Sequence, residues 1–182
     1  MIKSKEDLLY YLECDKKALQ ISHKRPRLFT DEIWRYEIAL RKLEYYTNCK
    51  CLGGWILRQY WHLKHKILGV LLGYTIHINT IDEGLCLNHY GSIIISKYAK
   101  IGKWCTIHSC VNIGQNHSAE EVPQIGDNCF IGPGAKIFGK IVIRNNVSIG
   151  ANAVVNKSFD MDNIVIAGIP AKIISRKNFN DK

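Results

Sequence analysis

The sequence predicts a mainly β protein, a parallel β-helix preceded by a short α-helical segment. The main support is an aliphatic residue that returns at every sixth position, often with glycine directly behind it. These aliphatic residues form two runs: Ile95, Ile101, Ile107 and Ile113, then Ile125, Ile131, Ile137, Ile143, Ile149 and Val155. A period of six fits neither an α-helix nor a simple strand alternation, so it indicates stacked hexapeptide repeats.

A second feature is the residue four positions after the aliphatic one, which is often small. It is Ala99, Cys105, Val111, Cys129, Ala135, Ile141, Val147 and Ala153 along the two runs. We expect each repeat to point both side chains into a narrow interior. Turns are expected at Asn145, Asn146 and Asn152, because asparagine tolerates a positive φ at little cost. Stacked coils bury one aliphatic column, so no repeat is stable alone.

The chain divides into three parts. Residues 1–74 have helical spacing, residues 75–174 carry the repeat, and residues 175–182 are expected to form a polar tail. In the first part, Ser4 with Asp7 forms a capping box at the start of one helix. A second helix is capped by Thr30 or Asp31, and residues 55–72 predict a third.

The third predicted helix, residues 55–72, combines tryptophan and tyrosine with basic residues, a composition typical of membrane interfaces. Its charges interrupt the apolar run too often for a membrane span. Packing on the β-helix or on a neighbouring subunit is the simpler interpretation, and peripheral association with the inner face of the membrane is the alternative. His62 and His65 have no third ligand nearby, so no metal site is predicted.

Charge and cysteine content limit the partners and the location. The formal net charge of +9 indicates phosphate-bearing small molecules, an anionic membrane or nucleic acid. No basic run with interleaved aromatics marks a nucleic-acid groove, so nucleic acid is not expected. The seven cysteines fit no zinc spacing, and the N-terminus lacks the apolar core of a signal peptide. These features favour reduced thiols in a cytoplasmic protein.

The repeat is broken at two places, where chemistry is expected because a regular coil offers only walls. Two extra residues lie between Leu87 and Ile95, next to His89. A bulge there would aim a side chain outward. Between Ile113 and Ile125, a polar loop replaces an ordinary repeat.

Five motifs carry a family resemblance: NHYG at 88–91, IGDN at 125–128, IGPGAKI at 131–137, IGANAVV at 149–155 and AGIPAK at 167–172. With them, the region from about 75 to 175 resembles the left-handed β-helix, hexapeptide-repeat acyltransferases. The resemblance is greatest to the serine-acetyltransferase-like branch found in bacterial surface-polysaccharide gene clusters. It implies a left-handed coil, a homotrimer, acetyl-CoA as acetyl donor and no required metal.

The resemblance also implies roles for residues at the two breaks. A histidine at the position of His89 is the general base in that family, and imidazole suits this task because its pKa lies near neutrality. His108, expected on the neighbouring coil, is a second catalytic candidate that orients His89 or the acceptor. Asn88 and His117 are candidates for substrate binding, and backbone N–H groups near Gly114 are candidate donors to the developing oxyanion.

Acetyl-CoA is expected in the groove between adjacent β-helices of the trimer. The candidate residues along this groove are Gly114, Gly132, Ala135, Lys136, Ala153 and Lys172. Lysine supplies a compact positive charge for phosphate. The glycines and alanines also serve packing and turn geometry.

Departures from the serine enzymes bear on the acceptor. Asn88 stands where those enzymes carry an aspartate associated with binding the amino acid, and Val122 stands where they carry a second histidine. We therefore predict an acetyl-CoA-dependent O-acetyltransferase whose acceptor is a sugar hydroxyl of a surface polysaccharide or its precursor. The alternatives are a serine O-acetyltransferase of cysteine biosynthesis and a non-catalytic trimeric β-helix scaffold.

Overall fold

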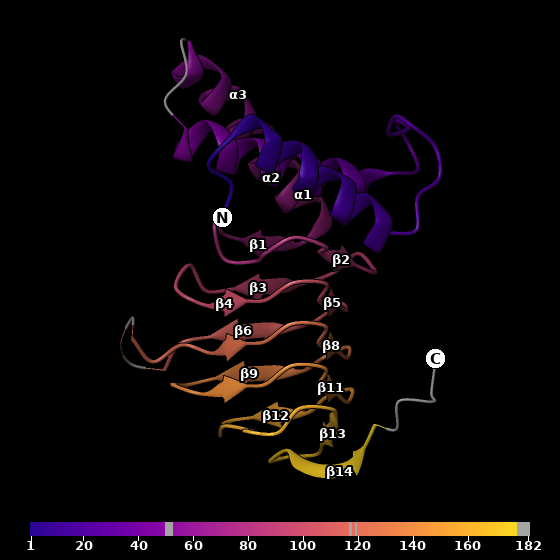
Figure 1. Cartoon of the computed structure of the whole chain (residues 1–182), viewed down its shortest axis with the longest axis vertical. Coiled ribbons are helices and arrows are strands. Elements are labelled where there is room, and N and C mark those ends of the chain that lie inside the picture. The colour runs from indigo at the N-terminus through magenta and orange to yellow at the C-terminus, as the bar shows by residue number, and fades with distance from the viewer. Residues whose placement is uncertain (50–52, 117, 119, 178–182) are drawn as a thin grey trace.

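Three helices cover one end of a β-helix in the computed structural model, which describes residues 1–49, 53–116, 118 and 120–177 (Figure 1). The helices are α1 (Lys5–Ala18), α2 (Glu32–Asn48) and α3 (Gly54–Leu72). The predicted capping box begins α1: the Asp7 N–H donates to Ser4 Oγ at 3.0 Å, and the Ser4 N–H donates to the Asp7 carboxylate at 3.1 Å. Asp31 precedes α2 but makes no capping hydrogen bond to it.

The strands form three walls that the chain visits in turn. Wall A contains β1 (Tyr74–Ile76), β3 (Ile93–Ile95), β6 (Asn112–Gly114), β9 (Lys136–Phe138) and β12 (Val154–Val155). Wall B contains β4 (Lys100–Ile101), β7 (Gln124–Ile125) and β10 (Val142–Ile143). Wall C contains β2 (Cys86–Leu87), β5 (Thr106–Ile107), β8 (Phe130–Ile131), β11 (Ser148–Ile149), β13 (Ile164–Ala167) and β14 (Lys172–Arg176). Pairing within the walls is parallel until β14, which runs antiparallel to β13.

The end of the β-helix differs from the sequence expectation. Strand β14 runs to Arg176 and so includes the first two residues of the polar tail predicted from residue 175. The Lys177 N–H still donates to the Asn163 carbonyl at 2.7 Å. Backbone pairing explains the difference, because β14 covers the edge of wall C that β13 would otherwise leave open.

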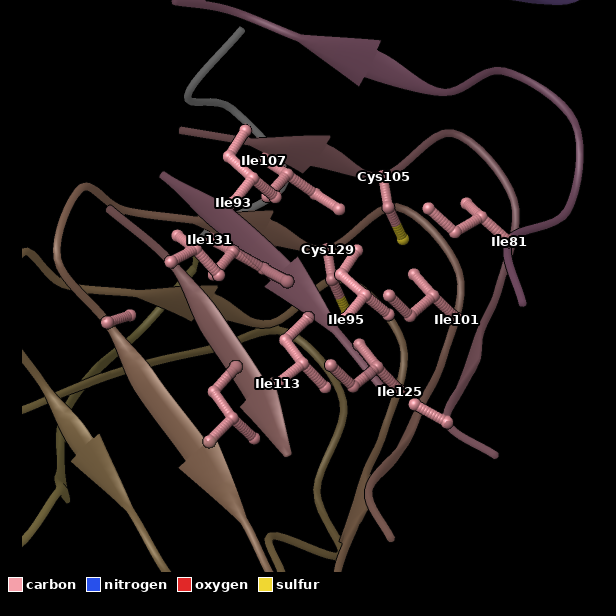
Figure 2. Close-up of a cluster of buried hydrophobic side chains, with 14 of the residues drawn as sticks. Ile81, Ile93, Ile95, Ile101, Cys105, Ile107, Ile113, Ile125, Cys129 and Ile131 are labelled. Atoms are coloured by element: carbon pink, nitrogen blue, oxygen red, sulfur yellow. The ribbon is translucent and has the colours of Figure 1, made fainter. Parts of the chain in front are cut away.

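The interior is the predicted aliphatic column. Every one of the ten aliphatic positions of the two runs is at most 4% exposed, and their side chains stack from coil to coil (Figure 2). The register is direct: Ile95 pairs with Ile113, and Ile113 with Ile137. Cys105 and Cys129 are buried free thiols inside the column, as the repeat predicts.

Asparagine shapes several turns of the coil. Asn146 and Asn152 have φ of 58° and 55°, as predicted for these positions. Asn145 is different, because its side chain accepts a hydrogen bond from the Asp127 N–H at 2.8 Å. Gly132 allows close stacking, since a Cβ there would lie 2.7 Å from the Ile149 carbonyl oxygen.

A buried ionic cluster, which the sequence did not reveal, attaches the helices to the first coil. Arg41 is fully buried and donates to Asp15 at 2.7 Å and to Glu44 at 3.1 Å. Its remaining N–H groups donate to the carbonyls of Ile81 at 2.8 Å and Asp82 at 2.7 Å. A guanidinium buried away from water needs all these hydrogen-bond partners, so Arg41 fixes the helices against the first coil.

Candidate functional site

The first break of the repeat is a turn that leaves wall C. Strand β2 ends at Leu87 and β3 begins at Ile93, and the Asn88, His89 and Tyr90 side chains between them are exposed. Gly91 supports the turn with φ of 122°, a conformation that side-chain-bearing residues rarely adopt. The extra residues predicted here therefore present His89 to solvent.

The turn is held by hydrogen bonds from the helical segment and β1. The bonded pairs are Leu87 N–H to Glu37 Oε1 at 3.2 Å, Tyr74 Oη to the His89 carbonyl at 2.9 Å, Tyr90 Oη to Glu32 Oε2 at 3.0 Å and Gly91 N–H to the Leu72 carbonyl at 3.0 Å. Tyr74 is itself fixed by an edge-to-face contact with Tyr36, with ring centroids 5.0 Å apart. Residues far apart in sequence thus define where the turn lies.

His89 and His108 form a pair on neighbouring coils, as the sequence predicts. Their ring centroids are 5.5 Å apart, and β2 pairs directly with β5, which His108 follows. Asn88 Nδ2 lies 2.9 Å from His108 Nε2. When the amide donates, His108 Nε2 is the acceptor and carries no proton. Burial and the nearby His89 lower the pKa of His108, which favours this neutral form.

A cavity of about 550 Å³ is lined by neither histidine, but it is lined by two neighbours of His108: Asn88, and Phe130, whose ring centroid lies 4.9 Å from that of His108. On the β-helix side it is lined by Asn88, Thr106 and Phe130, and on the helical side by Gln20 and Trp34 among others. We call it the acceptor pocket. Thr106 and Phe130 were not predicted as site residues. Each lies directly before an interior isoleucine of the repeat, and this position marks an outward-facing residue of wall C.

Asp31 also lines the acceptor pocket, but its carboxylate is already engaged. It lies 2.7 Å from His23 Nε2 and accepts the Arg27 N–H at 2.6 Å. These interactions lower the pKa of Asp31, the Arg27 N–H contributing most. The pocket therefore offers mainly amide, hydroxyl and aromatic groups.

Four of the six predicted cofactor residues follow one corner of the coil. The turns leading from wall C to wall A contain, in successive coils, His89, His108, Gly132 with Ala135, and Ala153, and Lys136 follows directly in β9. Lys172 begins β14, and Gly114 ends β6 at the far edge of wall A. Gly114 therefore lies away from this corner.

Side-chain placement separates the lysines from the alanines. Ala135 and Ala153 are fully buried in the interior, and their backbone groups bond to neighbouring coils, so their side chains do not face a groove. Lys136 and Lys172 are exposed. Lys136 Nζ donates to the Cys110 carbonyl at 2.6 Å and has further N–H groups for phosphate. The small interior position of the repeat explains why both alanine side chains are buried.

The second break lies on another corner, between β6 of wall A and β7 of wall B (Figure 1). Within its described residues, the Asn116 N–H donates to the Glu121 carbonyl at 3.3 Å and the Glu121 N–H to the Ser118 carbonyl at 3.2 Å. His117, the predicted substrate-binding residue, lies outside the described residues. In the described part of the chain, the two breaks therefore lie at different corners of the coil.

No group of three metal-ligating side chains occurs among the described residues. His65, for which no metal site with His62 was predicted, stacks on Tyr36 with ring centroids 4.8 Å apart. Burial lowers the pKa of His65 to about 4, so the ring is neutral in its packed position.

Comparison with known proteins supports the repeat and the fold. The family model described as "Bacterial transferase hexapeptide (six repeats)" matches residues 123–157. A serine acetyltransferase of Synechococcus elongatus is 30% identical over 135 residues, which cover 70% of this chain and 55% of that protein. One from Staphylococcus aureus is 37% identical over 98 residues, 53% of this chain and 46% of that protein. The chain spans about half the length of these curated relatives.

Solved structures agree over nearly the whole chain. Serine acetyltransferase from Brucella abortus has a TM-score of 0.74 at 23% identity, covering 95% of this chain and 71% of that one. The enzyme from Neisseria gonorrhoeae gives a TM-score of 0.72 at 23% identity, covering 96% and 69%. At this identity the likeness concerns the fold. The chain thus has the left-handed β-helix fold seen in serine acetyltransferases, and its residues 123–157 match the hexapeptide repeat of bacterial transferases.

Proposed function

We propose that this protein is an acetyl-CoA-dependent O-acetyltransferase in which His89 is the general base. The observation that carries the proposal is the position of His89: it stands exposed in the turn after β2, paired with His108, and its neighbour Asn88 contacts His108 and lines the acceptor pocket. The relatives' names support acetyl transfer. A β-helix scaffold without catalysis does not require this arrangement.

The chemistry follows from the two imidazoles. His89 accepts the proton of the acceptor hydroxyl as its oxygen attacks the acetyl carbonyl, and returns a proton to the departing thiolate. The acetyl group moves directly to the acceptor oxygen, so no covalent enzyme intermediate is needed. His108, neutral and hydrogen-bonded to Asn88, positions the acceptor or the ring of His89.

Acetyl-CoA is proposed to lie along the corner that descends from His89. Exposed Lys136 and Lys172 fit its phosphates, whereas buried Ala135 and Ala153 shape the coil beneath. The proposal includes a homotrimer, in which a neighbouring subunit brings its loop between β6 and β7 to the corner of His89. The cytoplasm remains the proposed location, favoured by the free cysteines.

Serine is the acceptor that the comparisons favour over the sugar expected from the sequence. The relatives and solved structures described above are all named serine acetyltransferases. Serine has a hydroxyl of the required kind, and it is therefore the first acceptor to test.

A neutral sugar hydroxyl is a second candidate, and the acceptor pocket supports it. Asn88 offers an amide where an ammonium group would need a carboxylate, and Asp31 is engaged by His23 and Arg27. Trp34 and Phe130 supply aromatic surface beside polar groups from Thr106 and Gln20. A sugar ring combines the same apolar faces and hydroxyl edges.

The deciding experiment measures thiol release from acetyl-CoA by the purified chain. Serine is compared with free neutral hexoses and nucleotide sugars at equal concentrations. Turnover with serine at least tenfold above every sugar establishes the serine acceptor, and the reverse establishes the sugar. No acceptor-dependent thiol release with either class, from a chain that is folded by circular dichroism, would contradict the proposed activity.

Asn88→Asp sharpens the choice. A carboxylate at this position adds an ionic hydrogen bond to an ammonium group, worth about 1.5–3 kcal/mol, so the KM for serine should fall about tenfold or more. The KM for a neutral sugar should not fall. Asn156→Asp, at an exposed position on the far side of β12, introduces the same charge as a matched control and should change neither KM.

A further inference from the structure

Helix α3 is apolar on two opposite sides. One side packs on the rest of the protein through Leu68, Leu72 and Trp61. The other carries large apolar side chains that are half to three-quarters exposed: Ile56, Tyr60, Leu63, Ile67, Val70 and Leu71. At about 100° per residue these six positions fall within an arc of about 100°, so they form one continuous face. We call it the outer face of α3.

Positive charge flanks the outer face. Helix α3 contains no aspartate or glutamate, but it contains Arg58, Lys64 and Lys66. By the same helical spacing, Lys64 and Lys66 lie along the two opposite borders of the outer face. Tyr60 within the outer face and Trp55 near it are exposed, and such aromatic rings favour the boundary between water and lipid. An apolar strip bordered by lysines is typical of a helix that lies in the membrane interface.

A shallow groove at the outer face provides a site for an anion. It has a volume of about 400 Å³, and Tyr60, Leu63, Ile67 and Leu71 give it an apolar floor. Arg35 of α2 and Lys64 line it together, and burial and the charge of Arg35 lower the pKa of Lys64. Neither cation makes an ion pair within the described part of the chain.

Glu32 also lines this groove, but it is directed elsewhere. Its Oε2 accepts a hydrogen bond from Tyr90 Oη at 3.0 Å, at the turn that carries His89. Arg35 donates one N–H to the Leu28 carbonyl at 2.6 Å, and Lys64 Nζ lies 4.8 Å from the centroid of the Trp61 ring, but both cations retain further N–H groups for a negatively charged group. A phosphate between them would relieve their mutual repulsion.

We propose that the outer face of α3 docks on an anionic lipid bilayer, with the helix lying in the plane of the interface. The apolar side chains enter the acyl boundary, and a lipid phosphate lies between Arg35 and Lys64. None of the helices in the described part of the chain has the length and apolarity to cross a bilayer, so this is surface binding. Helix α3 lies at the end of the molecule opposite β14 (Figure 1).

A second copy that docks through its own outer face is a poorer occupant of this face. Two outer faces in contact would bring both sets of Arg35, Lys64 and Lys66 together, with no carboxylate of α3 to compensate. An anionic bilayer supplies the missing negative charge. The inference holds for either acceptor.

Cosedimentation of the full chain with vesicles tests the proposal. Binding is expected to vesicles of phosphatidylcholine with 30% phosphatidylglycerol, to be much weaker with phosphatidylcholine alone, and to fall when salt rises from about 0.1 to 0.5 M. Leu63→Gln should raise the lipid concentration for half-maximal binding at least about tenfold, because a buried leucine is lost. Lys66→Gln should raise it about fivefold.

Matched variants identify the face. Leu9→Gln in α1 makes the same change at a leucine of nearly equal exposure, 59% against 58% for Leu63, and should leave binding unchanged. Lys140→Gln, at an exposed lysine of the β-helix, is the charge control. Equal binding by Leu63→Gln and Leu9→Gln would overturn the proposal. Absence of wild-type binding to the anionic vesicles, with self-association that Leu63→Gln abolishes, would overturn it in favour of a subunit interface.

Discussion

The two breaks of the repeat are built differently. The turn after β2 is bound to the helical segment and β1 at Leu87, His89, Tyr90 and Gly91. The loop after β6 is held in its described part chiefly by bonds between its own residues and by Ser96, whose hydroxyl donates to Gln115 at 3.3 Å. The first break is thus positioned by the helical segment and β1, whereas the bonds described for the second break lie within the β-helix.

This difference assigns a task to the helical segment. Glu37, Tyr74 and Leu72 do not face the acceptor pocket, yet they fix the backbone on both sides of His89. A general base must lie within hydrogen-bond reach of the proton that it takes, so backbone position matters for the rate. The helices therefore act as a support for the proposed base as well as a cover for the end of the coil.

The sharpest test of the comparison is His89→Ala. Loss of the base should reduce kcat about 10²–10⁴-fold with whichever acceptor proves active, while the circular dichroism spectrum is unchanged. His77→Ala, another exposed histidine, should retain activity. Full activity of the His89→Ala variant would contradict the assignment of His89 as the base, and the first break would then be an ordinary turn.

Arg41→Ala tests the attachment of the helices. Removal of the guanidinium leaves Asp15 and Glu44 buried without their partner, so the free energy of unfolding should fall by about 3–5 kcal/mol in urea titrations. Amide exchange should increase at Leu87 and Gly91 more than at Glu121. Arg144→Ala, at an exposed arginine, should change stability by less than about 0.5 kcal/mol.

Glu37→Gln tests the first break through pH. Burial, with the Asp15 carboxylate nearby, raises the pKa of Glu37 well above its ordinary value. As pH rises above about 4.3, the unfolded chain releases this proton while the folded chain holds it, so Glu37 lowers stability up to its folded pKa.

The glutamine keeps the oxygen that accepts the Leu87 N–H but cannot ionise. Relative to the wild type, the variant should gain about 1 kcal/mol or more between pH 4 and pH 8, measured by urea unfolding at several pH values. Glu13→Gln, at an exposed glutamate, is the control and should show no such gain. Parallel pH profiles of the wild type and Glu37→Gln would contradict the assigned burial.

Tyr74→Phe should have the smallest effect. It removes the bond to the His89 carbonyl, worth about 0.5–1.5 kcal/mol, and leaves the packing on Tyr36 in place. We expect kcat to fall about two- to tenfold with little change in KM, because the base is displaced but the acceptor pocket is intact. Tyr98→Phe, on an exposed tyrosine, should not alter kcat. A change in KM alone would count against a positioning role.

The repeat made much of this protein predictable. The period of six identified the interior residues, the coil and both breaks, because in a stacked coil each residue's environment depends on its place in the hexapeptide. The capping box at Ser4 was readable for the same local reason. The adjacency of His89 and His108 followed from the length of one coil.

Predictions that depended on side-chain direction were less secure. Ala135 and Ala153 were expected beside the cofactor, but the interior position of the repeat buries them. The acceptor pocket was not foreseen, since it combines wall C with the loops that flank α1 and α2. No local pattern encodes such a meeting.

The sequence by itself determined the coil, its aliphatic column and the place of the proposed base, because these depend on neighbours at fixed spacing. Only the tertiary structure decided how that base is held and what faces it. Arg41, Glu37 and Tyr74 make these contacts across 15 to 50 positions of sequence, and the contacts exist only once the helices have packed on the first coil. Long-range packing, which has no period, therefore sets the geometry of the site.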